Sequence, residues 1–293
     1  MNQRRQIKYE LHQLVPYINW IYYYHAWQVK DAAEQQRLRE EAECLLAGFE
    51  GRYHVHALFL LADANSDGDD LVVFDAGTVA GADRQPAGSV VRIPFLRQQH
   101  QQPGQPCLCL ADFVRPLSQG IPDMVGFFAT SVDAALVADH QRDDYLRMTT
   151  QLLADRLAEA AAEKMHQEVR RRYWGYQPDE QLTMAELHAE QFQGIRPAVG
   201  YPSLPDASLN FILSSLLRFS DIGIRLTESG AMVPHASVSG LMLAHPQSRY
   251  FAVGAIDEEQ LHDYARRRGI PVELARRFLS SSLRTPVSPK SNP

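Results

Sequence analysis

The chain has 293 residues, 45% of them hydrophobic, which is enough to bury the core of one large domain or two small ones. Its formal net charge of -6 argues against a broad nucleic-acid-binding surface, and no apolar run is long enough to span a membrane. The N-terminal stretch MNQRRQIKYELHQ lacks the apolar core of a signal peptide. We therefore expect a cytoplasmic protein whose three cysteines, Cys44, Cys107 and Cys109, are reduced and buried.

Residues 1–50 are predicted to be helical, with the aromatic run PYINWIYYYHAW ahead of a charged stretch. From residue 53 the sequence changes to short apolar runs, which are typical of a mostly antiparallel sheet with some strands buried on both faces. These runs are YHVHALFLLA, DLVVFD, SVVRIPF, CLCLADFV and DMVGFFATS. The polar stretch RQQHQQPGQP between two of them predicts a surface loop.

One long helix is predicted from Ala134 to Arg172, because this stretch contains neither proline nor glycine. Within it, Asp155, Glu159 and Glu163 recur at four-residue spacing, so their carboxylates share one face of the helix. From the spacing alone, a solvated face is a more common explanation than a binding face.

After this helix, ASLNFILSSLLRF predicts an amphipathic helix, and ASVSGLMLAHP and RYFAVGAI predict two strands. DEEQLHDYARRRG begins with a capping Asp and ends with Gly, and PVELARRFL starts a last helix with Pro. The tail, residues 281–293, is expected to be disordered. Strands in one region with helices at either end predict an α+β fold, not a doubly wound one.

Two stretches resemble metal-binding motifs, but each lacks a required ligand. DANSDGDDLVVF matches the first half of a calcium-binding EF-hand loop, but Phe74 occupies the position that needs a bidentate Glu. A tight acidic turn between two strands explains this stretch better. His54 and His56 share a strand face without a third ligand at a suitable spacing. We therefore predict no metal site, and the usual nucleotide-binding and hydrolase motifs are also absent from the sequence.

The segment GIRPAVGYPSLPD, residues 194–206, has neither helical nor strand periodicity. Its three prolines stiffen an extended backbone. The guanidinium of Arg196 suits a carboxylate or a phosphate, and the peptide groups of Ala198 and Gly200 suit an amino group or a heterocycle. Tyr201 adds an amphipathic ring. Two interpretations remain open: a site for a small zwitterionic or nucleoside ligand, and a structural turn whose arginine caps a helix.

Longer motifs give the chain a resemblance to one family over nearly its whole length, weakest between about residues 34 and 105. They are RRYWGYQPDEQL, QGIRPAVGYPSLPD, IRLTESGAMVPHASVSGLMLAHPQSRYFAVGAI and DYARRRGI, with HQRDDYLRMTTQLLADRLAEA, CLADFVRP and PYINW upstream. They resemble the activation domain of cobalamin-dependent methionine synthase, which binds S-adenosylmethionine (SAM). The resemblance implies a curved α+β module with a twisted antiparallel sheet flanked by helices, one of them long and central. This module would span residues 1–280, divided into a helical segment (1–50), the sheet and long helix (51–175) and a ligand-loop region (176–280).

The resemblance also implies the residues of a SAM site. Arg196 matches the arginine that holds the methionyl carboxylate of SAM in the family. The other matched SAM contacts are Asn19, Glu159, Ala198, Gly200, Tyr201, Tyr250 and Phe251. The residues matched to the corrin-facing side are Tyr201, Asp155 and Glu159.

Two positions depart from the family pattern. Asn19 stands where the family normally has Asp, so it keeps a hydrogen bond but loses a charge, which implies a weaker affinity for SAM. Ala207 stands where a His usually follows the GYPxxP motif, so a contact on the corrin-facing side is in question.

The function implied is the reactivation of a cobalamin-dependent methionine synthase. SAM would methylate cob(II)alamin while a flavodoxin-like donor supplies an electron. The D-x-H-x-x-G signature of a cobalamin-binding module does not occur in the chain, so cobalamin is expected on a partner. We expect a free-standing subunit that does not turn over alone and has no nucleic-acid or membrane partner. The alternative is a module that senses SAM or docks on a corrinoid protein without turnover.

Overall fold

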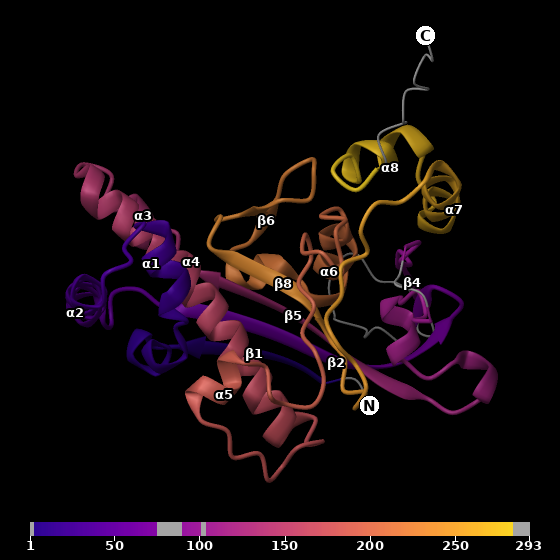
Figure 1. Cartoon of the computed structure of the whole chain (residues 1–293), viewed down its shortest axis with the longest axis horizontal. Coiled ribbons are helices and arrows are strands. Elements are labelled where there is room, and N and C mark those ends of the chain that lie inside the picture. Colours follow the sequence, from indigo (N-terminus) through magenta and orange to yellow (C-terminus); the bar gives the residue numbers. More distant parts are fainter. Residues whose placement is uncertain (1–2, 75–89, 101–103, 284–293) are drawn as a thin grey trace.

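The fold is built around one long strand, β2. The computed structural model describes residues 3–74, 90–100 and 104–283. In this part of the chain, six strands form an antiparallel sheet in the order β4-β3-β2-β5-β8, and β1 pairs with the N-terminal half of β2 (Figure 1). The strands are β1 (Gln3–Tyr9), β2 (Val55–Asp67), β3 (Asp70–Phe74), β4 (Val90–Pro94), β5 (Asp123–Val132) and β8 (Ser237–Met242), with a separate hairpin of β6 (Arg225–Leu226) and β7 (Met232–Val233).

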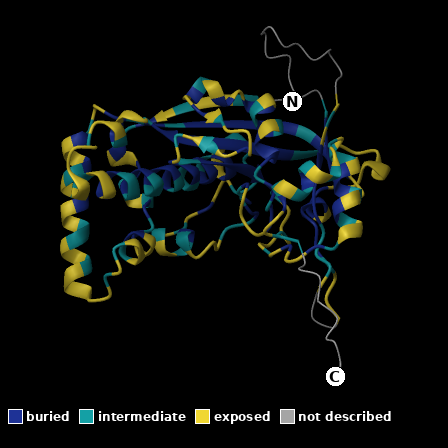
Figure 2. Ribbon diagram, turned by 90° about the horizontal axis from the view of Figure 1, so that it is seen from above, coloured by how far each residue is buried: buried dark blue, intermediate teal, exposed yellow. Residues whose placement is uncertain are grey.

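The strand β2 is buried on both faces, as its apolar sequence predicts. Its residues at odd positions from 55 to 61 pack with the long helix α4 (Asp144–Glu168). Those at even positions from 58 to 64 pack with α6 (Leu209–Leu217) on the opposite face. The sheet therefore lies between two layers, and its strands are mostly dark blue in Figure 2. This arrangement confirms the α+β fold with a flanked antiparallel sheet.

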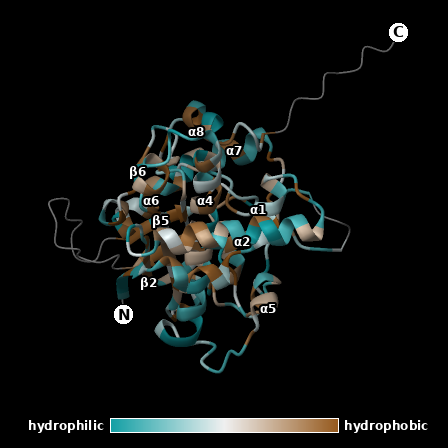
Figure 3. Cartoon of the chain, turned by 90° about the vertical axis from the view of Figure 1, so that its left-hand side faces the viewer, coloured by the Kyte–Doolittle hydropathy of each residue, from teal (hydrophilic) through white to brown (hydrophobic). Residues whose placement is uncertain are grey.

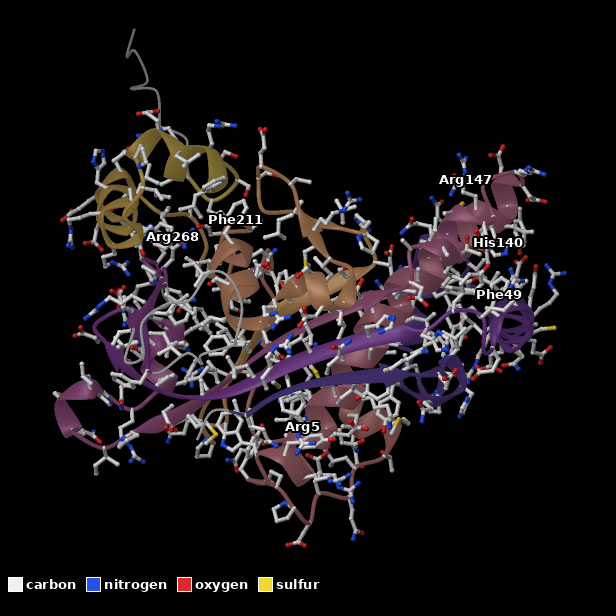
Figure 4. All side chains as sticks on the ribbon, turned by 180° about the vertical axis from the view of Figure 1, so that it is seen from behind. Arg5, Phe49, His140, Arg147, Phe211 and Arg268 are labelled. Carbon is white, nitrogen blue, oxygen red and sulfur yellow. The ribbon has the colours of Figure 1, made fainter. Side chains whose placement is uncertain are left out.

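Three shorter helices extend the α4 layer at the end of the molecule that lies far from α7 and α8 (Figure 1). They are α1 (Trp20–Ala26), α2 (Ala32–Phe49) and α3 (Ala135–Ala138). The helix α2 is largely hydrophilic along its outer surface (Figure 3). Phe49 at its end packs against His140 beyond α3, with ring centroids 4.8 Å apart (Figure 4). This contact joins two segments that are distant in sequence.

The helix predicted from Ala134 to Arg172 is interrupted, so that prediction was wrong in its extent. A new helix, α4, begins after Asp143, whose side chain accepts a hydrogen bond from the N–H of Leu146 and so caps it. Beyond α4 the chain continues as a π-helical turn, Val169–Tyr173. The sequence does not indicate this break, because residues 139–143 contain neither proline nor glycine. The new start of the helix depends on the Asp143 cap instead.

Several other predicted elements are also corrected by the structure. The first residues form β1 instead of a helix, because pairing with β2 overrides their polar composition. The stretch CLCLADFV is no strand; it contains a 3-10 turn, Leu110–Phe113, in which Asp112 accepts from the N–H of Cys109. RYFAVGAI is no strand either, since Val253 donates its N–H to the carbonyl of Pro202 in an irregular segment. The acidic turn between β2 and β3 is confirmed.

The single-residue predictions for thiols and histidines can be compared directly with the structure. Cys109 is buried, but Cys107 is only half-buried and Cys44 is exposed, so the expectation of three buried thiols was wrong. His56 pairs with Asp133, at 2.9 Å between Nε2 and Oδ1. The residues that the structure describes contain no group of three or more metal-ligating side chains arranged around one point.

The C-terminal region closes the other end of the molecule with α7 (Glu258–Arg268) and α8 (Val272–Phe278) (Figure 1). As predicted, Asp257 caps α7 and Gly269 ends it with φ of 67°. Arg268 donates to Ser208 Oγ at 2.9 Å and so joins α7 to the start of α6 (Figure 4). Within the described ranges, no helix has the length and apolar character needed to cross a membrane. Most of the predicted disordered tail lies outside these ranges, and the boundary at residue 280 stays a prediction.

Candidate ligand-binding site

The segment 195–199 lies along the outer edge of β8 and extends the sheet. Its backbone approaches β8 closely, because a Cβ atom on Gly240 would overlap the carbonyl oxygen of Pro197. Glycine at position 240 is therefore a requirement of the contact. The bridges that join the two segments are Ile195 with Leu243 and Ala198 with Gly240.

This pairing decides which peptide groups of the segment can meet a ligand. In an extended chain, alternate N–H groups point to opposite sides, so those of Arg196 and Ala198 point away from β8. The N–H of Arg196 donates to the phenol oxygen of Tyr250 at 2.9 Å. The N–H of Ala198 has no protein partner in the described chain. Gly200, with φ of 88°, donates its N–H to the carbonyl of Leu204 at 2.8 Å, so this donor is already used.

The guanidinium of Arg196 lies between the segment and the helix α4. Its Nη2 donates to Oε2 of Glu163 at 2.9 Å, and the two side chains are only 11% and 13% exposed. The guanidinium carbon also lies 5.6 Å from the centroid of the Phe128 ring. Arg196 is therefore held in a largely buried position by a carboxylate and an aromatic ring, and it does not cap a helix.

A cavity of about 600 Å³ opens between α4, the segment 195–203 and the start of α1. This volume is in the range of small-molecule binding sites. All the predicted SAM contacts line it except Gly200, which lies in the loop beside it. Its lining residues include Asn19, Glu159, Arg196, Ala198, Tyr201, Tyr250 and Phe251, together with Tyr17, Tyr22, Arg156, Glu163, His188, Glu190, Pro202 and Ser203.

Residues 10–269 match the sequence profile of one family, described as the activation domain of vitamin B12 dependent methionine synthase. The chain belongs to this family. Its fold is also similar to a crystal structure of the MetH reactivation domain bound to AdoHcy, with a TM-score of 0.87 and 36% sequence identity. That alignment covers 97% of this chain and 91% of that chain. The family expected from the sequence motifs is thus confirmed.

In this activation domain, Tyr201 and Glu159 form one wall of the cavity. The phenol of Tyr201 donates to Oε1 of Glu159 at 2.9 Å, while the ring stays 53% exposed. Partial burial of the hydroxyl and the charge of Glu159 raise the pKa of Tyr201 to about 12. At neutral pH the phenol is therefore protonated and can only donate to this carboxylate.

Asp155 does not line the main cavity of the activation domain. It borders a neighbouring hollow of about 150 Å³, which Glu159 and Tyr201 also line. Its Oδ1 lies 3.3 Å from Nδ1 of His235, whose side chain is 84% exposed. The three residues matched to the corrin-facing side therefore border one hollow beside the cavity.

The two departures from the family pattern have different surroundings. Asn19 precedes α1, and its Oδ1 accepts a hydrogen bond from the N–H of Ile21 at 3.3 Å, so it acts as a helix cap at the rim of the cavity. Ala207 is not among the residues that line the cavity. The neighbouring Asp206 is buried and accepts from the phenol of Tyr264 at 2.7 Å, which gives this stretch a structural role.

Several cavity residues were not predicted as site residues. Glu163 could have been found, since it shares the four-residue spacing of the helix carboxylates. Glu190 follows no such pattern; it has φ of 55°, and burial raises the pKa of its carboxyl group. Tyr22 lies with its ring 5.4 Å from the guanidinium carbon of Arg156 at the cavity rim. Glu190 and Tyr22 reach the cavity through tertiary packing, for which the sequence gives no signal.

Proposed function

We propose that this activation domain binds SAM in the 600 Å³ cavity and presents the methyl group to cob(II)alamin on a partner. The observation that carries the proposal is the convergence of three distant segments, near Asn19, Arg196 and Tyr250, on one cavity in a member of this family. The similar MetH reactivation domain was solved with AdoHcy bound, and AdoHcy is SAM without the transferred methyl group.

The charges around the cavity support a ligand with both signs and a positive excess. Among the described lining residues, Glu159, Glu163 and Glu190 are carboxylates, whereas Arg156 and Arg196 are cations. SAM carries a carboxylate, an ammonium group and a sulfonium, so its net charge is positive. A guanidinium fork suits the carboxylate, and the surplus carboxylate favours the sulfonium.

Backbone and aromatic groups of the cavity suit the remaining parts of SAM. The N–H of Ala198 is a backbone donor held in place by the pairing with β8, which suits a ring nitrogen of adenine or an oxygen of the amino-acid end. Tyr250 and Phe251 supply an apolar wall for the adenosine part. Because the loop is fixed before the ligand arrives, little conformational entropy is lost on binding.

The corrin-facing role is assigned to the open hollow beside the cavity. Tyr201 borders both spaces, so a methyl group held in the cavity would lie close to a corrin seated over Tyr201, Glu159 and Asp155. SAM supplies the methyl group and a flavodoxin-like donor supplies the electron, so the protein's task is to position the ligand. We place this exchange in the cytoplasm, with the cobalamin-binding modules of a methionine synthase as partner.

Two measurements test the proposal. Isothermal titration calorimetry should detect SAM binding to the purified domain, and absence of binding would refute the proposal. Mixed with a cobalamin-bearing methionine synthase partner, SAM and an electron donor, the domain should convert cob(II)alamin to methylcobalamin, seen as a change in corrin absorbance. Asp155→Lys should impair this conversion more than it impairs SAM binding. SAM binding without any conversion would favour the sensing or docking alternative.

A further inference from the structure

The ion pair between Arg196 and Glu163 leaves two buried polar atoms without a partner. Arg196 Nε and Glu163 Oε1 are both inaccessible to solvent, and neither has a hydrogen-bond partner within the described chain. An unpaired polar atom in a protein interior is costly, so such atoms call for an explanation. Both side chains line the cavity, so a ligand can become the partner of these two atoms once a change of rotamer turns them toward it.

We propose that Glu163 binds the α-ammonium group of the ligand while Arg196 binds its α-carboxylate. This inference rests on the proposed SAM site and adds a residue to it. In an α-amino acid the two charged groups are bonded to the same carbon. A donor and an acceptor of opposite charge, held 2.9 Å apart in the lining of a cavity, match that arrangement. The unpaired Nε would donate to the carboxylate, and the unpaired Oε1 would accept from the ammonium group.

Three other acceptor side chains that line the cavity fit the ammonium group less well. Oε1 of Glu159 already accepts from the phenol of Tyr201. Glu190 is only partly shielded from solvent, so a charged contact there is weaker. Asn19 carries no charge, and its Oδ1 caps α1. Glu163 is the buried carboxylate that already touches the guanidinium, so it is the best placed of the four.

The pair also has a role before the ligand binds. A buried guanidinium without a counter-charge is strongly unfavourable, so Glu163 keeps Arg196 charged and in place in the empty site. Glu163 therefore both opposes and assists the ligand: it competes with the ligand carboxylate for Arg196, and it attracts the ammonium group. These two effects have opposite signs and can be separated with ligand analogues.

The test compares wild type and Glu163→Gln by isothermal titration calorimetry with two ligands. One is SAM, and the other is the SAM analogue in which hydrogen replaces the α-ammonium group. Gln keeps a side-chain oxygen that can accept from Arg196 but has no charge for an ammonium group. We expect the Kd for SAM to rise about tenfold or more, as the loss of a charge-assisted hydrogen bond implies. The Kd for the deaminated analogue should be unchanged or lower, because Arg196 loses a competitor.

The outcomes separate this inference from the proposed function. Equal losses with both ligands would mean that Glu163 only positions Arg196, and unchanged affinity for both ligands would mean that it plays no part; either result overturns the inference. Failure of wild-type protein to bind SAM would instead overturn the proposed function. Asp144→Asn, at an α4 carboxylate whose side chain is 91% exposed, is the matched control and should leave both affinities unchanged. Melting temperatures of both variants report whether the fold is intact.

Discussion

Tyr250 accepts a hydrogen bond from the backbone N–H of Arg196 at 2.9 Å, although the two residues are 54 positions apart. This contact ties the segment after β8 to the segment that runs along β8. Each segment contributes to the cavity, and each carries one of the two motifs that the family resemblance assigns to the ligand. The contact therefore couples the two halves of the candidate site.

The variant Tyr250→Phe tests this coupling. It removes the oxygen that accepts from the Arg196 N–H but keeps the aromatic wall. We expect SAM affinity to fall by about 1 kcal/mol, the net value of one hydrogen bond, with a lower melting temperature. Calorimetry and thermal unfolding measure the two effects. Tyr145→Phe is the control: it removes a solvent-exposed hydrogen bond to Glu41 and should leave SAM affinity unchanged. A Tyr250→Phe protein that binds like wild type would show that the segments are positioned independently.

Arg196→Ala should weaken SAM binding by about 2–4 kcal/mol, because a largely buried charge pair with the ligand carboxylate is lost. The same change leaves Glu163 buried without its cation, so thermal unfolding must accompany the calorimetry. Arg147→Ala, at an exposed arginine of α4, is the control for loss of positive charge. Unchanged affinity in a folded Arg196→Ala protein would remove Arg196 from the site.

Asn19→Asp should tighten SAM binding by about 1 kcal/mol, since it restores a charge near the positive ligand. The substitution suits the fold, because Asp caps helices as well as Asn and its charge interacts favourably with the N-terminus of α1. Titration calorimetry on the two proteins decides the question. An equal or weaker affinity would mean that Asn19 is adapted to its own surroundings, and the departure from the family then carries no functional information.

Glu159→Gln should lower the pKa of Tyr201 from about 12, because the phenolate would no longer form beside a negative charge. Alkaline titration of the tyrosine absorbance measures this, with Tyr201→Phe identifying the signal. In wild type the folded chain holds this proton more tightly than the unfolded chain, whose phenol titrates near 10.0. The stability that Tyr201 contributes is thus present below pH 10 and is lost as the pH rises toward 12. A pKa that does not move would separate Tyr201 from Glu159.

Gly240→Ala should displace the segment 195–199 from β8, since its Cβ would overlap the Pro197 carbonyl oxygen. Overpacking of this kind costs about 1–3 kcal/mol, and the displacement should also weaken SAM binding. Gly48→Ala is the matched control: its Cβ would meet nothing within 4 Å, and the residue lies in α2, where alanine is favoured by about 1 kcal/mol. A Gly240→Ala protein with wild-type stability and affinity would contradict this account of the loop.

The sequence predicts correctly the elements that are determined by a local cap or by a continuous apolar run. The helix α7 has its Asp257 cap and its Gly269 end where the sequence indicates, and β2 has the continuous apolar run of a strand buried on both faces. Two of the errors come from tertiary pairing. The polar sequence of β1 forms a strand only because β2 offers it an edge, and RYFAVGAI forms none because the segment 195–199 already occupies the edge of β8.

The residues of the candidate site also differ in how far the sequence predicts them. Arg196 and Tyr201 stand in a motif that is unusual in its own right, so they could be singled out from the sequence. The spacing of the α4 carboxylates includes Glu163, but its pairing with Arg196 could not be predicted, because that contact exists only once α4 has packed against the sheet. Gly200 is predicted as a backbone contact, and this stays a prediction; that its N–H closes a local turn with Leu204 is not visible in the composition.

The position of the segment 195–199 on β8 has a consequence for solubility. At the end of the strand order, β8 would present unpaired N–H and C=O groups, and an open strand edge invites pairing with other chains and aggregation. The ligand-binding segment covers this edge. Substitutions that loosen the segment would therefore favour insoluble protein as well as weaker binding, and light scattering during expression trials of Gly240 variants would reveal the difference.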